Sequence, residues 1–151
     1  MLKSVLPTTE TRPNMAGSNT PGCTSLDTPA MREAVEGTID GTLRSFVEFD
    51  SDAFTVVHYD DRTRSFYDDE AHMMEHFEEI HSYVHIDFTE ADFFTERLFP
   101  IADHVRYLAT SFDVFTLLRV YFDDEGLFMA LDRDEPVEPV VEAIEAVHGS
   151  R

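Results

Sequence analysis

Four histidines fall within fourteen residues, in the segment HMMEHFEEIHSYVH at positions 72 to 85. Its first five residues fit the pattern H-x-x-E-H, a signature of one class of zinc peptidase. In that chemistry His72 and His76, one helical turn apart, bind a Zn²⁺ ion while Glu75 acts as general base. These three residues are therefore the candidates for a metal site, and HMMEH raises the hypothesis of a metal-dependent hydrolase.

The same segment has the apolar spacing of a helix that lies on a core. At about 100° per residue, Met73, Phe77 and Ile80 share one narrow stripe. His72 and His76 then lie on one shoulder of the stripe, and the other two histidines lie on the opposite shoulder. A catalytic zinc also needs a third protein ligand, and no second motif supplies one. We therefore predict histidines that flank a buried stripe, with no metal and no other cofactor.

Other catalytic motifs are missing from the sequence. It contains no G-x-S-x-G nucleophile context, no glycine-rich phosphate loop and no calcium-binding loop pattern. The single cysteine, Cys23, excludes a disulfide within the chain and lies in a segment too flexible in composition to position a nucleophile. We expect a protein that is not an enzyme.

The outlying property of the chain is its charge. The 31 Asp and Glu residues outnumber 11 Lys and Arg residues, which gives a net charge of -20, and Lys3 is the only lysine. Such a composition is typical of proteins from a salt-loving cytoplasm, because at molar salt the Debye length is about 3 Å and crowded carboxylates repel less. A dedicated electrostatic function, such as nucleic-acid mimicry or cation binding, is the alternative. Direct binding to nucleic acid or anionic lipid is disfavoured, since both require basic patches. Arg106 and Arg119, in predicted strands, are expected to pair with carboxylates.

Residues 1–28 differ in composition from the rest of the chain. They are rich in Thr, Ser, Pro, Gly and Asn, and their charges cancel, so the excess negative charge lies in residues 29–151. We predict a disordered N-terminal tail over 1–28 and a single domain over 29–151; a translation start at Met15 or Met31 is an alternative reading. The sequence has neither a signal-peptide pattern nor an apolar stretch long enough to span a bilayer, so we expect a soluble, cytoplasmic protein.

The periodicity of the chain predicts an α+β domain. The order is α-β-β-α-β-β-β-α, with a second short helix directly after the middle one, and it gives a central antiparallel sheet of about five strands with helices packed on it. The predicted helices cover 28–48, 69–84, 90–98 and 136–149, and the predicted strands cover 53–61, 64–69, 105–112, 114–122 and 126–133.

Aromatic residues crowd one short segment between the second helix and the third strand. They are Phe88, Phe93, Phe94, Leu98 and Phe99. A helix over 90–98 would carry more apolar surface than one face buries. We predict that these residues either cover the open side of the sheet or form an interface, through self-association or with another protein.

Two phrases, LRSFVEFDSDAFTVVHYDD and FTLLRVYFDDEGLFMALD, resemble a group of small, acidic, functionally uncharacterised haloarchaeal proteins, over residues 35 to 148. The order of elements is also similar to that of roadblock and profilin-like domains. These resemblances imply a dimerising scaffold or regulator, here a non-enzymatic regulatory or protein-interaction module of a halophilic archaeon. The alternative is a small-ligand sensor, in which the sheet and the helix bearing Met73, Phe77 and Ile80 enclose a pocket.

Overall fold

The computed structural model describes residues 22–150. One antiparallel sheet has the strand order β2-β1-β5-β4-β3, with strands β1 (Leu43–Asp50), β2 (Phe54–Tyr59), β3 (Tyr107–Ser111), β4 (Phe115–Phe122) and β5 (Glu125–Asp132). The helices are α1 (Thr28–Thr38), α2 (Asp61–Ser65), α3 (Glu70–Val84), α4 (Asp87–Phe93), the π-helical turn η2 (Phe94–Leu98) and α5 (Val137–Gly149). The predicted α+β class and the five-stranded antiparallel sheet are confirmed.

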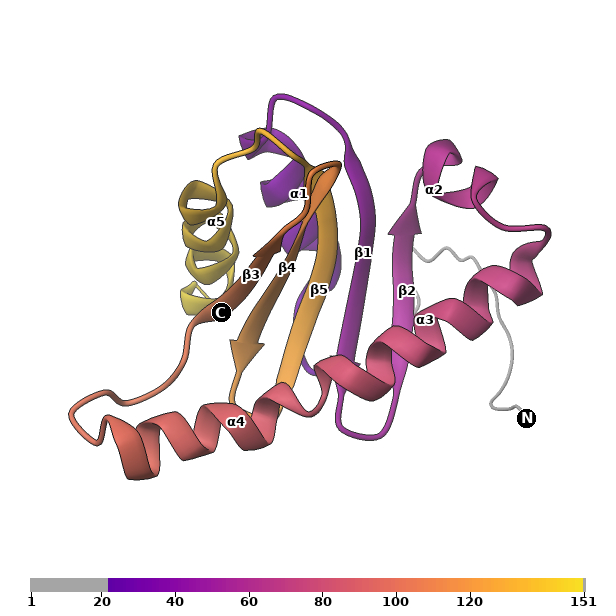
Figure 1. The fold of residues 1–151 in the computed structure, drawn as a ribbon. Helices are drawn as coiled ribbons and strands as arrows, with labels where there is room; N and C mark the ends of the chain where they lie inside the picture. Colours follow the sequence, from indigo (N-terminus) through magenta and orange to yellow (C-terminus); the bar gives the residue numbers. More distant parts are fainter. Residues whose placement is uncertain (1–21, 151) are drawn as a thin grey trace.

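Helices cover both faces of the sheet (Figure 1). On one face, α1 and α5 pack through a first core cluster that includes Met31, Val35, Phe46, Leu118, Val140 and Ile144. On the other face, α3 packs through a second cluster that includes Val47, Phe49, Met73, Phe77 and Phe128. The sheet is therefore the middle of three layers, and its central strands are buried on both sides. None of the helices within 22–150 is long and apolar enough to cross a membrane.

The prediction of one helix over 28–48 was wrong. α1 ends at Thr38, where Ile39 takes up an extended backbone, and the residues from Leu43 onward form the interior strand β1. Because β1 is buried on both faces and carries a bulge between Phe46 and Val47, its apolar residues do not alternate. As a result Leu43 and Phe46, which are three residues apart, had the spacing of a helix and were wrongly assigned to one.

A smaller prediction near this region was also wrong. The segment 64–69 is not a strand but the end of the short helix α2 and the loop that follows it. Asp60 is the N-cap of α2, since its side chain accepts a hydrogen bond from the Thr63 backbone N–H at 2.8 Å. In the same way Asp27 caps α1 by accepting a hydrogen bond from the Ala30 backbone N–H at 3.3 Å.

The residues just before α1 pack against the sheet. Thr24 donates its backbone N–H and its hydroxyl to Glu48 Oε1, at 3.1 and 2.6 Å. Ser25 donates the corresponding groups to Glu125, at 2.9 and 2.7 Å, and Leu26 is buried in the first core cluster. Residues 22–27, which we predicted to be tail, are therefore in contact with the domain, and residues 1–21 lie outside the described part.

Candidate interaction surface

The aromatic segment follows α3 and runs past the ends of the strands (Figure 1). Phe88 points into the protein, where its ring centroid lies 5.5 Å from those of Phe49 and Tyr121. The remaining members of the predicted set are exposed, to 48% for Phe93, 38% for Phe94, 47% for Leu98 and 56% for Phe99, and Ile101 beside them is 94% exposed. We call these five exposed residues the aromatic surface.

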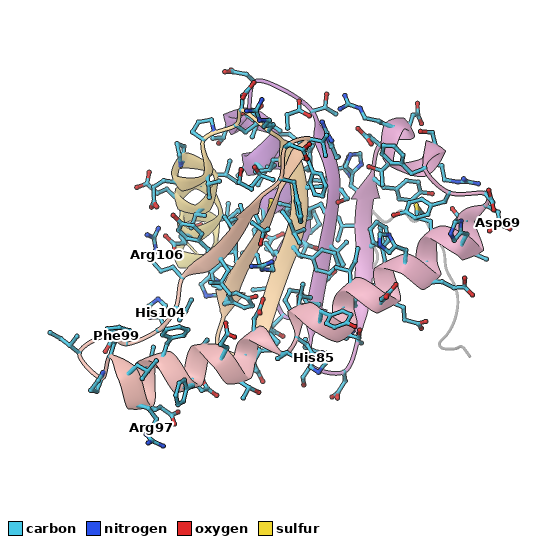
Figure 2. All side chains as sticks on the ribbon, in the orientation of Figure 1. Asp69, His85, Arg97, Phe99, His104 and Arg106 are labelled. Atoms are coloured by element: carbon cyan, nitrogen blue, oxygen red, sulfur yellow. The ribbon has the colours of Figure 1, made fainter. Side chains whose placement is uncertain are left out.

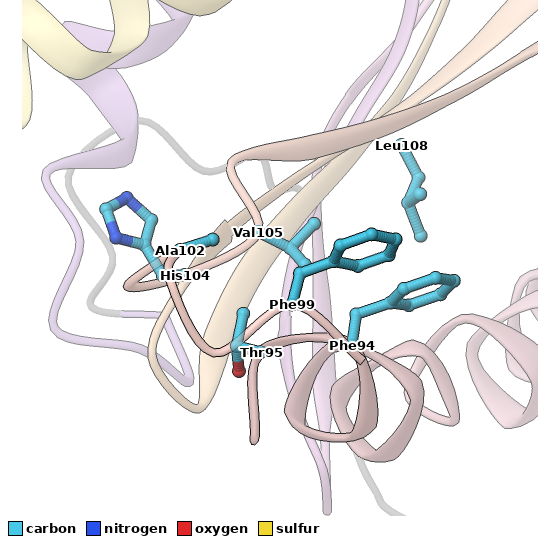
Figure 3. Close-up of a pocket in the computed structure, with 7 residues that line it drawn as sticks. All are labelled: Phe94, Thr95, Phe99, Ala102, His104, Val105 and Leu108. Atoms are coloured by element: carbon cyan, nitrogen blue, oxygen red, sulfur yellow. The ribbon is translucent and has the colours of Figure 1, made fainter. Parts of the chain in front are cut away.

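The π-helical turn η2 shapes this surface. The Phe99 N–H donates to the Phe94 carbonyl oxygen at 2.6 Å, a bond that spans five residues. As a result the rings of Phe94 and Phe99 stack, with centroids 6.1 Å apart and planes 9° from parallel. The rings border an open hollow of about 330 Å³ against Leu108 of β3 (Figure 3). Its lining is almost entirely apolar, and His104, at its margin, projects away from the two rings.

The strand beside the aromatic surface is an edge of the sheet. Among the described strands, β3 pairs with β4 alone. In a chain with a net charge of -20, the run from His104 to Phe112 contains no Asp or Glu. An edge strand normally carries charges that keep other strands away, and β3 itself has none. Apolar side chains and an unguarded sheet edge thus lie next to each other.

Ion pairs attach this region to the rest of the protein, as predicted for the strand arginines. Arg106, just before β3, donates to Glu138 and Glu145 of α5 at 2.8 Å each. Arg119 of β4 pairs with Asp87 of α4 through Nε at 3.2 Å. By contrast Arg97, at the end of η2, points away from the body of the protein (Figure 2).

The histidines of the HMMEH segment make local contacts. His72 Nδ1 accepts the Asp68 backbone N–H at 3.1 Å, and His76 Nδ1 lies 2.6 Å from the Tyr67 hydroxyl. The Tyr67 ring contacts both imidazoles, at centroid distances of 5.3 and 5.5 Å. In this arrangement the Asp68 N–H occupies Nδ1 of His72, and the Tyr67 hydroxyl lies at Nδ1 of His76.

The other histidine pair is bonded to main-chain carbonyls. His81 Nε2 lies 2.8 Å from the Asp50 carbonyl oxygen, and His85 Nδ1 lies 3.1 Å from that of His81. Across residues 22–150, no group of three or more His, Cys, Asp or Glu side chains is arranged to hold a metal ion. The predicted candidates His72, Glu75 and His76 thus have no third ligand in the part of the chain that the structure describes.

The helix that the sensor hypothesis placed over a pocket packs into the core. Met73 and Phe77 are buried in the second core cluster, and Ile80 packs against it. This confirms the predicted apolar stripe of α3. The hollow described above lies elsewhere, between η2 and β3, and it is open to solvent.

Two carboxylates that are shielded from solvent, Asp87 and Glu48, could not be recognised from the sequence, since their only distinguishing property there is their charge. Asp87 joins Arg119 and Tyr121 beneath α4. Glu48 lies in the sheet, where burial raises the pKa of its carboxyl. Close to Glu48, burial and the Glu48 charge together raise the pKa of the Cys23 thiol to about 12, so this cysteine is a poor nucleophile. In so acidic a chain, only tertiary structure distinguishes these carboxylates from the others.

No protein-family model matches the chain, and no curated protein matches its sequence. The structure is similar to the crystal structure of a Roadblock/LC7 domain from Streptomyces avermitilis, with a TM-score of 0.56. The match covers 84% of this chain and 94% of that one, at 14% sequence identity. An identity this low establishes the fold alone. The chain thus has the α+β fold of a Roadblock/LC7 domain, as the predicted order of elements indicated.

Proposed function

We propose that this protein is a non-enzymatic protein-interaction module of a halophilic archaeon, which self-associates through the aromatic surface and the neighbouring edge of β3. The observation that carries the proposal is a group of five exposed apolar side chains, of which Phe94 and Phe99 border a hollow against Leu108 of an edge strand without charged residues. Contiguous exposed apolar surface of this kind marks interaction sites in soluble proteins. An open strand edge can add main-chain hydrogen bonds to such a contact.

A second copy of the chain is the partner that best fits this edge. Two β3 strands that pair antiparallel across a two-fold axis would extend the sheet, and they would bring both aromatic surfaces to the same interface. The absence of carboxylates between His104 and Phe112 limits repulsion at the contact itself. Repulsion between the two acidic bodies remains, and molar salt screens it.

Sedimentation velocity over a range of protein and KCl concentrations tests the proposal. We expect a monomer–dimer equilibrium that shifts toward the dimer as KCl rises to molar levels. F99E should shift it back to the monomer, because a carboxylate would be buried in the contact.

F66E is the matched control. Phe66 is also exposed, to 70%, but it lies beyond α2, at the other edge of the sheet. F66E should leave the equilibrium unchanged. A wild-type protein that stays monomeric at every salt concentration, or equal effects of the two substitutions, would rule out self-association through this surface.

A further inference from the structure

A polar cluster beneath α4 connects the aromatic surface to the edge strand. Asp87, the first residue of α4, accepts a hydrogen bond on Oδ2 from the Tyr121 hydroxyl and forms an ion pair with Arg119, whose Nε lies 3.2 Å from the same oxygen. Tyr121 and Arg119 both lie on β4, the neighbour of β3. Arg119 Nη1 also donates to Thr110 Oγ1 of β3 at 3.1 Å. A chain of polar contacts therefore runs from α4 through β4 to β3.

The members of this cluster are largely shielded from solvent. The side chains of Arg119 and Asp87 are 16% and 19% exposed, and Tyr121 is buried. Burial and the nearby Asp87 carboxylate raise the pKa of the Tyr121 hydroxyl, so Tyr121 keeps its proton and acts as a donor. Removing one partner from such a cluster leaves the others with unsatisfied polar groups. The hydrogen bonds of the cluster therefore have preferred directions, and the loss of one member destabilises the protein.

α4 has few other attachments to the protein. None of its residues is fully buried. Its apolar anchor is Phe88, which lies against Phe49 and Tyr121. Phe88 can hold the helix near the sheet, but ring packing permits the helix to rotate or slide. The hydrogen bond from Tyr121 to Asp87 restricts that freedom, because it has a preferred direction, and the ion pair with Arg119 holds the Asp87 carboxylate near β4.

We propose that Asp87 is the positioning residue of the aromatic surface: through Arg119 and Tyr121 it sets the orientation of α4 and η2 relative to the edge strand β3. This inference rests on the proposed function, since it assigns Asp87 a role in forming that same contact. Without Asp87, α4 and η2 shift, Phe94 and Phe99 lose their alignment with Leu108, and the dimer contact is weakened while the core stays folded.

The test compares D87N with the matched control D132N. Asp132 pairs with Arg44 Nε at 2.9 Å and is also partly buried, but it lies at the opposite end of the strands, where β5 pairs with Phe115. We expect D87N to raise the dimer dissociation constant about tenfold or more, which is about 1.4 kcal/mol. D132N should lower the melting temperature at least as much as D87N does. It should leave the dimer dissociation constant within about twofold of the wild-type value. Equal effects of the two variants on dissociation would overturn the proposal.

A second measurement separates this inference from the proposed function. Amide hydrogen exchange at dilute protein concentration reports on the monomer. We expect D87N to speed exchange across residues 88–98 without affecting β5, and Y121F, which removes one donor and keeps the ring, to do so to a smaller extent. If the wild type never dimerises, the proposed function fails and exchange still decides the role of Asp87. Unchanged exchange in 88–98 for both variants would refute it.

Discussion

Arg32 Nη2 of α1 lies 3.1 Å from His58 Nδ1 of β2, and the other ring nitrogen of His58, Nε2, lies 3.0 Å from the Leu43 carbonyl oxygen. A carbonyl oxygen only accepts, so Nε2 carries the proton, and Nδ1 accepts from Arg32. His58 is therefore held as the neutral imidazole. Burial, and then the charge of Arg32, lower its pKa from the ordinary value of 6.5.

The first prediction concerns the pH dependence that follows from His58. Because the folded-state pKa lies below the unfolded one, the stabilisation is complete above pH 6.5 and is lost as pH falls toward the folded-state pKa. R32M should raise the pKa of His58 by removing a positive charge. E36Q should lower it further, because Glu36 favours the protonated ring. NMR titration of the His58 ring protons measures both shifts, and shifts in the same direction would contradict the arrangement.

The second prediction concerns the buried carboxylate of Glu48, which is 2% exposed. Its folded-state pKa is raised, chiefly by burial, so its contribution to stability is complete below its unfolded pKa and is lost as pH rises through the folded one. E48Q keeps an acceptor for Thr24 and removes the buried charge. We expect a higher melting temperature at neutral pH and a flatter dependence of stability on pH in thermal denaturation.

E48A is the control for Glu48. It removes the acceptor together with the charge, so the donors on Thr24 lose their partner. We expect the free energy of unfolding to fall by about 1–3 kcal/mol. Equal melting temperatures for E48Q and E48A would show that the hydrogen bonds to Glu48 do not stabilise the fold.

The third prediction compares two glycines. A Cβ at Gly126 of β5 would lie 2.9 Å from both Phe49 Cζ and the Val120 carbonyl oxygen, whereas a Cβ at Gly37 of α1 would meet nothing within 4 Å. G126A should destabilise the protein by about 1–3 kcal/mol through overpacking. G37A should stabilise it by about 0.5–1 kcal/mol, because alanine is the better helix former. Urea denaturation gives both values, and a stable G126A variant would show that the sheet can relax there.

The fourth prediction concerns zinc. Metal analysis of protein purified without a metal-affinity column should find zinc well below one ion per chain, since His72 and His76 are bonded to the Tyr67–Asp68 segment. Added zinc should change the melting temperature of neither the wild type nor H76Q. Stoichiometric zinc that disappears in H76Q would restore the hydrolase hypothesis.

Sequence patterns predicted most elements of this fold but missed the strand β1 and the short helix α2. The apolar stripe that includes Met73 and Phe77 could be predicted because α3 has one buried and one exposed face. β1 lacks the alternation that identifies a strand, because it is buried on both faces. β5 is also buried on both faces, yet its strand was predicted correctly at 126–133. The error at β1 therefore arose because Leu43 and Phe46 continue the helical spacing of the apolar residues in α1.

The candidate surface was predictable in location but not in detail. Crowded aromatic residues in 88–99 indicated surplus apolar area, yet only the structure separates Phe88, which packs inward, from Phe94 and Phe99. The π-helical turn has no sequence signal that we recognise. Asp87 was indistinguishable from the other carboxylates because its partners, Arg119 and Tyr121, are distant in the chain.

The stacked pair Phe94–Phe99 depends on chain length more than on the identity of the intervening side chains. In a regular α-helix, residues five apart point about 140° away from each other, at about 100° per residue. The wider turn at η2 accommodates one more residue and brings the two rings together. Deleting one residue between them would leave the rings four residues apart, about 40° from each other in a regular α-helix, so they would stay on one face. Inserting one residue would instead turn one ring away from the other, at about 240°. Relatives of this protein would then keep the pair through a one-codon deletion and lose it through a one-codon insertion, a difference that substitution-based comparisons of sequences overlook.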